Sequence, residues 1–206
     1  MTRWLSSIVE FFAFSSAWEL VAVLLALAYL LLAVKRSLWC WLAALISSAI
    51  YLVLMLQVKL YMQTALQVFY LGMAIYGFVE WRKGRDAAGE VVIARWKAAT
   101  HVYVIGAVFA VSALNGWLLA RNTDAAWPYL DAFVTWGSVV TTVMVARRVI
   151  ENWLYWIVVD GVAAYLYFRQ GLNPTAVLFV VYIGIVIHGF WVWRREARAA
   201  REVASR

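Results

Sequence analysis

Charged residues, cysteine and histidine are all scarce in this sequence. Only 14% of the 206 residues are charged and 66% are hydrophobic, and a soluble domain of this length could not hide that much apolar surface. The single cysteine, Cys40, excludes an internal disulfide and any multi-cysteine metal site. His101 and His188 stand far apart and outside any HExxH-type spacing. We therefore expect neither a bound metal nor another cofactor.

Motifs of enzymes and of nucleic-acid-binding proteins are also missing. The sequence has no nucleophile elbow, no phosphate-binding loop and no paired-histidine motif. Its net charge of +7 comes from basic residues placed between apolar blocks, not along one polar face. These patterns argue against an enzyme and against a nucleic-acid partner, and they indicate a lipid bilayer as the surroundings.

Seven predominantly apolar blocks follow one another, each about as long as the 20 residues that a helix needs to cross a bilayer. They cover residues 17–34, 38–56, 60–81, 101–120, 129–146, 149–168 and 174–193. Backbone groups in lipid must be satisfied internally, so these blocks predict seven transmembrane helices in an all-α integral membrane fold. Residues 1–16 are too short and interrupted to span, and are expected to form an interfacial N-terminal segment.

Basic residues gather after the first, third, fifth and seventh blocks, and few lie in the alternate loops. The clustered residues are Lys35, Arg36, Arg82, Lys83, Arg85, Arg95, Lys97, Arg147, Arg148, Arg194, Arg195, Arg198, Arg201 and Arg206. The positive-inside rule then predicts a multi-pass protein with its N-terminus outside and its C-terminus in the cytoplasm.

An internal repeat becomes visible when the chain is shifted by 112 residues. YLGMAIYGFVEWRK (70–83) then lies over YIGIVIHGFWVWRR (182–195) without a gap. The register pairs Tyr70 with Tyr182, Gly72 with Gly184, Gly77 with Gly189, Trp81 with Trp193 and Lys35-Arg36 with Arg147-Arg148. Matched glycines, aromatic residues and basic pairs in one register indicate a duplicated unit of three helices.

The duplication predicts a 3+1+3 plan, in which one linker helix makes the two repeats parallel. The expected parts are residues 17–97 (first repeat with a cytoplasmic loop), 98–128 (linker helix and outer loop), 129–195 (second repeat) and 196–206 (basic cytoplasmic tail). Parallel repeats are a recurring transporter plan with the substrate near the membrane midplane. A channel or a scaffold could also be duplicated.

Polar residues inside spanning helices are costly and usually face an interior cavity. At about 100° per residue, three blocks each carry a polar face. These are Gln63, Gln67, Tyr70, Gly77 and Trp81 in the third block, Asp131, Thr135, Ser138 and Thr142 in the fifth, and Asn152, Trp156, Asp160 and Tyr167 in the sixth. The three faces predict one polar cavity.

Each of these features also has a structural explanation. Gly72, Gly77, Gly184 and Gly189 are expected to permit close helix packing. Trp81 and Trp193 stand beside basic pairs and are expected to anchor at the cytoplasmic interface. The hydroxyls of the fifth block could bond back to their own helix.

Asp160 is the sharpest polar signal. It stands past the middle of the sixth block, with no basic residue in the same span. Such a carboxylate is protonated, belongs to a structural hydrogen-bonded network, or is compensated by a cationic substrate. Trp156, one turn away, could offer its ring face to the same cation, an attraction of about 2 kcal/mol when desolvated.

Two long segments, LQVFYLGMAIYGFVEW (66–81) and ENWLYWIVVDGVAAYLYFRQGL (151–172), together with WCW at 39–41, resemble the PnuC family of vitamin-precursor transporters. The resemblance implies a 3+1+3 fold like that of SWEET sugar transporters. It implies transport of nicotinamide riboside by facilitated diffusion with alternating access, of thiamine in the PnuT branch, or of riboflavin in another. It further implies a bacterial inner membrane location, assembly as a homotrimer, and a cytoplasmic kinase that traps the product.

The resemblance also suggests residues that bind the substrate. Carried over by motif, these are Gln67, Tyr70, Tyr76, Asn152, Trp153, Trp156 and Asp160, to which the polar face of the third block adds Gln63. The family usually has tryptophan where this chain has Phe78. Nicotinamide riboside and thiamine are both flat cations, whereas riboflavin is larger and neutral, so Asp160 favours the first two. A small channel or regulatory membrane protein is the alternative from a different class.

Overall fold

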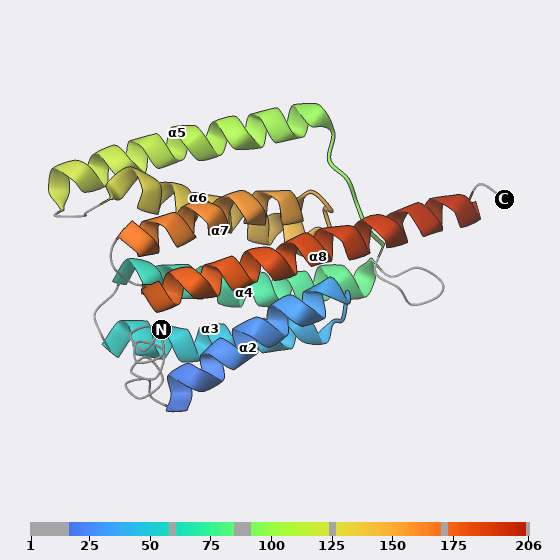
Figure 1. Ribbon diagram of the computed structural model, residues 1–206, viewed down its shortest axis with the longest axis horizontal. Helices are drawn as coiled ribbons and strands as arrows, with labels where there is room; N and C mark the ends of the chain where they lie inside the picture. The colour runs from blue at the N-terminus through green and yellow to red at the C-terminus, as the bar shows by residue number, and fades with distance from the viewer. Residues whose placement is uncertain (1–16, 58–60, 85–91, 124–126, 170–172, 205–206) are drawn as a thin grey trace, which may run out of the picture. The chain divides into compact units, whose positions relative to one another are not determined.

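The computed structural model describes residues 17–57, 61–84, 92–123, 127–169 and 173–204. Within these ranges it contains seven α-helices (Figure 1). They are α2 (Ala17–Val34), α3 (Trp39–Gln57), α4 (Tyr61–Lys83), α5 (Ala98–Asn122), α6 (Pro128–Ala146), α7 (Asn152–Arg169) and α8 (Asn173–Ala204). The predicted interfacial segment 1–16 lies outside the described residues.

Each apolar block predicted from the sequence forms one helix. Pro128 stands in the first turn of α6, where its missing N–H costs nothing. α8 continues past the predicted end of its block to Ala204, because the basic segment after residue 193 is rich in Ala, Arg and Glu, which favour helix. By length and composition, three of the described helical segments can cross a membrane: Ala98–Asn122, Pro128–Ala146 and Ala176–Ala200.

The chain divides into two compact units, Met1–Glu90 (unit 1) and Val91–Arg206 (unit 2). The segment 92–97, predicted to belong with the first three helices, is held in unit 2 by the turn between α6 and α7. The backbone N–H of Ala94 donates to the carbonyl of Arg148 at 2.9 Å, and that of Ile150 donates to the carbonyl of Ala94 at 3.0 Å. This single parallel bridge could not be inferred from the loop sequence.

In unit 1, α3 packs against both α2 and α4. The hydroxyl of Ser47 donates to the Ala22 carbonyl at 2.9 Å and joins α3 to α2. The Trp41 ring lies against Gly77 on α4 and meets Trp81 edge-on, with 5.4 Å between ring centroids. Trp81 is fully buried, so its predicted role as an interface anchor is wrong: the ring completes the packing between α3 and α4.

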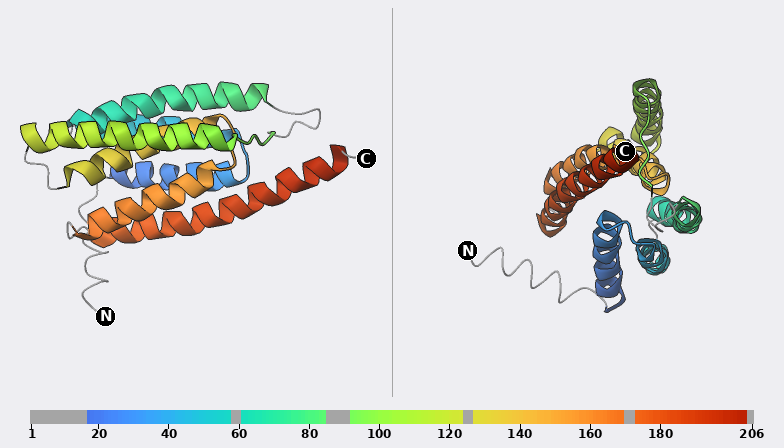
Figure 2. Two further views of the ribbon diagram at one scale, coloured as in Figure 1. Left: turned by 90° about the horizontal axis from the view of Figure 1, so that it is seen from above. Right: turned by 90° about the vertical axis from the view of Figure 1, so that its right-hand side faces the viewer.

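In unit 2, α5 packs on α6, α6 on α7, and α7 on α8; α8 runs alongside α7 in Figure 2. Trp153 on α7 lies against Gly189 and meets Trp193 edge-on at 5.4 Å. Trp193 is fully buried, which corrects its predicted interfacial role in the same way. The packing prediction holds for Gly77 and Gly189, but no atom lies within 4 Å of a Cβ built on Gly72 or Gly184.

Two arginines end helices in the left-handed conformation. Arg36 has a φ of 52° and follows α2, while Arg148 has a φ of 61° and follows α6. Beside them, the N–H of Ser37 donates to Leu32 at 3.0 Å and that of Val149 donates to Met144 at 2.9 Å. This is the Schellman pattern of helix ends, in which glycine is the usual residue.

Candidate functional site

Asp160 lies inside unit 2 on the apolar helix α7. Its side chain is 4% exposed, and none of the residues that the structure describes donates a hydrogen bond to its carboxylate within bonding distance. Trp156, one turn earlier on α7, is half-buried. A buried carboxylate costs free energy unless it is protonated or compensated. The arrangement is therefore suited to receive a cation or a hydrogen-bond donor next to an aromatic ring.

Gly137 allows α6 to approach α7 beside Asp160. A Cβ on Gly137 would lie 2.7 Å from Cγ2 of Val159, so any larger residue would push the helices apart. Ser138 and Asp160 are the chain neighbours of this contact. Close packing at this level excludes lipid and water from the carboxylate.

The hydroxyls of α6 are largely committed to their own helix. Thr142 Oγ1 donates to the Ser138 carbonyl, and Thr141 Oγ1 donates to the Gly137 carbonyl, each at 2.7 Å. The alternative reading of back-bonded hydroxyls is thereby confirmed for Thr142. Asp131, on the same predicted stripe, is exposed, so the stripe does not form one continuous polar surface.

Asn152 and Trp153 are sealed into the start of α7. Asn152 Nδ2 donates to the Val149 carbonyl at 2.6 Å, and the Trp153 ring is 1% exposed beneath Trp193. Asn152 Oδ1 and Trp153 Nε1 are buried with no hydrogen-bond partner among the described residues. These two atoms are polar groups that a solute or water could satisfy, although the Trp153 ring itself offers no free surface.

In unit 1, the predicted residues on α4 divide between two sides of the helix. Gln67 and Tyr70 are half-buried and, three residues apart, share one face. Tyr76 is 38% exposed and, at about 100° per residue, points to the side of α4 opposite Gln67. The side chain of Gln63 is outside the described part of the structure. The structure thus brings together Gln67 and Tyr70 but not Tyr76.

The structure also reveals a polar contact that sequence spacing could not predict. His101 Nδ1 lies 2.9 Å from the Tyr155 hydroxyl, 54 residues away in sequence. The Trp96 ring packs against His101 with 5.7 Å between centroids. His101, taken from the sequence as a packing residue, is therefore a packing residue with a hydrogen bond, and it fixes α5 to α7 next to Trp156.

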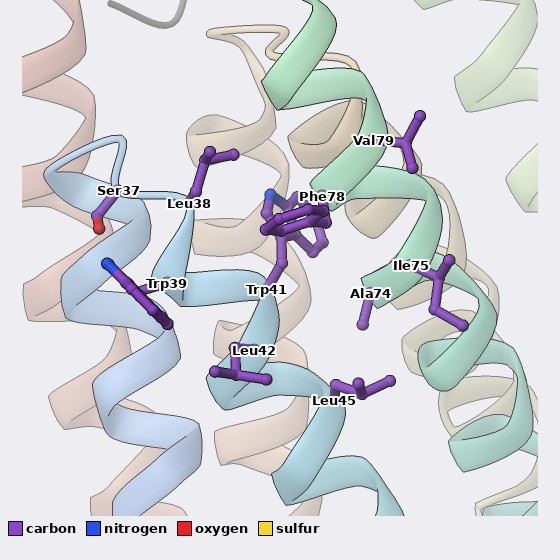
Figure 3. Close-up of a pocket in the computed structure, with 10 residues that line it drawn as sticks. All are labelled: Ser37, Leu38, Trp39, Trp41, Leu42, Leu45, Ala74, Ile75, Phe78 and Val79. Atoms are coloured by element: carbon purple, nitrogen blue, oxygen red, sulfur yellow. The ribbon is translucent and has the colours of Figure 1, made fainter.

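Two apolar grooves accompany these polar positions. One, of about 610 Å³, lies between α3 and α4 (Figure 3); the other, of about 270 Å³, is lined by residues of α5, α6 and α7. None of the eight predicted site residues lines either groove. Among the described residues, no three His, Cys, Asp or Glu side chains gather into a metal-binding group.

Comparison with known proteins places these features in a family. Residues 16–195 match the family model for the nicotinamide mononucleotide transporter. The riboflavin/roseoflavin transporter RibM of Streptomyces davaonensis is 29% identical over 90% of this chain and 88% of its own length. The nicotinamide riboside transporter PnuC of Escherichia coli is 25% identical over 75% of both chains.

A solved structure has the same fold. The crystal structure of the vitamin B3 transporter PnuC superposes with a TM-score of 0.73, covering 95% of this chain and 88% of the other at 24% identity. Members of the family are multi-pass inner-membrane transporters and not enzymes, as predicted from the missing catalytic motifs. This chain belongs to the PnuC family of vitamin-type transporters, the family described as nicotinamide mononucleotide transporters.

Proposed function

We propose that this protein carries nicotinamide riboside across the bacterial inner membrane by facilitated diffusion. The observation that supports this most is the buried carboxylate of Asp160 one helical turn from Trp156 on α7. Nicotinamide riboside is flat, aromatic and permanently cationic. Its ring can stack on an indole while its charge compensates the carboxylate, so both costs of burial fall together.

Thiamine is the close alternative, because it is also a flat aromatic cation. Riboflavin is a second candidate for a different reason: the relative RibM, a riboflavin/roseoflavin transporter, matches 90% of this chain. Riboflavin is neutral and would need Asp160 to be protonated or to accept hydrogen bonds from the ligand. The carboxylate therefore favours a cation, and the substrate has to be decided by measurement.

The proposed residues that contact the substrate are the predicted eight, with different weights. Trp156 and Asp160 supply the ring and the charge in unit 2. Gln67 and Tyr70 supply an amide and a phenol in unit 1, where both are half-buried. Asn152 and Trp153 contribute polar atoms from a packed position.

We further propose the 3+1+3 parallel, SWEET-like repeat with α5 as linker and alternating access as the mechanism. In its support, Trp41–Trp81 in unit 1 and Trp153–Trp193 in unit 2 have the same 5.4 Å centroid separation and nearly the same angle, 90° and 87°. The left-handed Arg36 and Arg148 stand in the same register of 112 residues. One chain length between so many equivalent contacts favours duplication.

The remaining features of the proposal come from loop charge and from the family resemblance. The basic ends of α4 and α8 favour a cytoplasmic C-terminus. A homotrimer and a cytoplasmic kinase that phosphorylates the imported vitamin complete the proposal. Light scattering of the purified protein measures the first. Accumulation of labelled vitamin in cells with and without the kinase measures the second.

The first test is isothermal titration of the purified protein with nicotinamide riboside, thiamine and riboflavin. We expect one of the two cations to bind, and Asp160→Asn to weaken that binding at least tenfold, a loss of about 1.4 kcal/mol. Asp131→Asn is the matched control, because Asp131 is an exposed carboxylate on α6. Binding of riboflavin alone, unchanged in Asp160→Asn, would contradict the proposal.

A further inference from the structure

The groove between α3 and α4 is a feature of unit 1 that the transport site does not use. Its volume is about 610 Å³, and its floor is formed by the buried Trp41 and Ala74. The exposed side chains of its walls are all large and apolar: Trp39, Leu42, Ile75, Phe78 and Val79. Figure 3 shows these side chains on the two facing helices, with Ser37 and Leu38 at one end.

Positive charge marks that same end of the groove. On α4, Ile75, Phe78 and Val79 follow the i, i+3, i+4 spacing of one helix face, and the next position on this face is Arg82. Lys35 precedes the groove residues Ser37 and Leu38 in the turn between α2 and α3. Both basic side chains are exposed. The groove is thus apolar along its length and cationic at one end only.

We propose that this groove binds an anionic phospholipid, with an acyl chain between α3 and α4 and the phosphate beside Arg82 and Lys35. The apolar stretch of α3 from Leu38 to Leu45 is about 10 Å long at 1.5 Å per residue, so it holds part of one acyl chain below the headgroup. Basic residues next to an apolar surface at the membrane interface attract acidic headgroups. The length, the apolar lining and the terminal charge all match one lipid molecule.

A second copy of the chain fits the same groove less well. Copies in one membrane have the same orientation, so their basic ends lie in the same leaflet. Two α3–α4 grooves facing each other would bring Arg82 and Lys35 of one copy near those of the other, and such like-charge contacts are unfavourable. A lipid phosphate neutralises these charges instead.

Unit 2 offers a natural control for the charged end. Shifted by 112 residues, Phe78, Val79 and Arg82 correspond to Phe190, Trp191 and Arg194. There, the Arg194 guanidinium lies over the chain's own rings, 5.3 Å from the Trp191 centroid and 6.0 Å from that of Phe190. A tryptophan in place of Val79 gives this arginine an internal partner, so we expect no comparable lipid preference at α8.

The test is native mass spectrometry of the purified full-length protein titrated with phosphatidylglycerol and, separately, phosphatidylcholine. We expect the wild type to retain phosphatidylglycerol in preference. The double variant Lys35→Gln/Arg82→Gln should lower that preference at least tenfold, since each basic residue near a membrane surface contributes roughly fivefold. Ile75→Trp, which fills the groove and keeps the charges, should lower the occupancy of both lipids. Arg194→Gln should leave the wild-type preference unchanged.

Three results would overturn the proposal. Equal retention of the two lipids by the wild type would remove the headgroup contact. Retention of phosphatidylglycerol by both groove variants would place the lipid elsewhere. Dissociation of an oligomer in Ile75→Trp, without any loss of lipid, would assign the groove to a second copy of the chain. Vitamin binding, measured in parallel by calorimetry, should be unaltered in every variant, so a misfolded protein is recognised at once.

Discussion

Gly189 and Trp153 are packed so closely that a Cβ atom on the glycine would lie 2.8 Å from the tryptophan ring. Gly77 and Trp41 have the same relationship in unit 1. In each unit a second tryptophan closes the contact edge-on, Trp193 in one and Trp81 in the other. These contacts join the last helix of each unit to the helix before it, and they support the helices that carry the proposed substrate residues.

Gly189→Ala should therefore destabilise the protein by about 1–3 kcal/mol, because overpacking forces the Trp153 ring or the α8 backbone to move. Gly184→Ala is the matched control on the same helix. A Cβ there meets no atom within 4 Å, and alanine favours helix over glycine by about 1 kcal/mol. Thermal unfolding in detergent should show a lower Tm for the first variant and an equal or higher Tm for the second. The same Tm in both would mean that α8 shifts freely against α7.

The two tryptophans at the start of α7 should respond differently to replacement. Trp153 is 1% exposed and fills the space over Gly189, so Trp153→Ala should cost about 3–5 kcal/mol of stability. Trp156 is half-buried near Asp160. Trp156→Ala should instead weaken binding of a cationic vitamin about tenfold, through lost stacking and cation–π attraction. Unfolding curves and calorimetric titration of the two variants separate these effects, and a stability loss at Trp156 alone would contradict the assignment.

The helices could be predicted from the sequence, but most of the contacts between them could not. A bilayer demands a long apolar run for each helix, so the run itself locates α2 to α8. Hydropathy says nothing about which ring meets which glycine: Trp81 and Trp193 looked like interface anchors because basic pairs follow them, yet both are buried. Motif resemblance likewise grouped Tyr76 with Gln67, although helical geometry puts them on opposite sides of α4.

Thr142 provides a test of whether α6 takes part in recognition. Its hydroxyl donates to the Ser138 carbonyl at 2.7 Å, so it has no proton to offer a solute. Thr142→Val should leave vitamin affinity within about twofold of wild type, because valine keeps the shape and the carbonyl retains its helical bond. A tenfold loss of affinity in the same calorimetric titration would show that the hydroxyl turns toward the substrate when it binds.

The hydrogen bond between His101 and Tyr155 predicts a measurable contribution to the packing of α5 on α7. The two side chains are part-buried at 2.9 Å, and a neutral hydrogen bond contributes about 1 kcal/mol. Tyr155→Phe keeps the ring that packs on His101 at 5.7 Å and removes only the hydroxyl. It should lower the stability by about that amount, whereas Tyr165→Phe, an exposed tyrosine on the same helix, should not. Because Tyr155 adjoins Trp156, vitamin affinity should be followed in the same samples. Unchanged stability together with a large loss of affinity would show that the Tyr155 hydroxyl serves the substrate and not the fold.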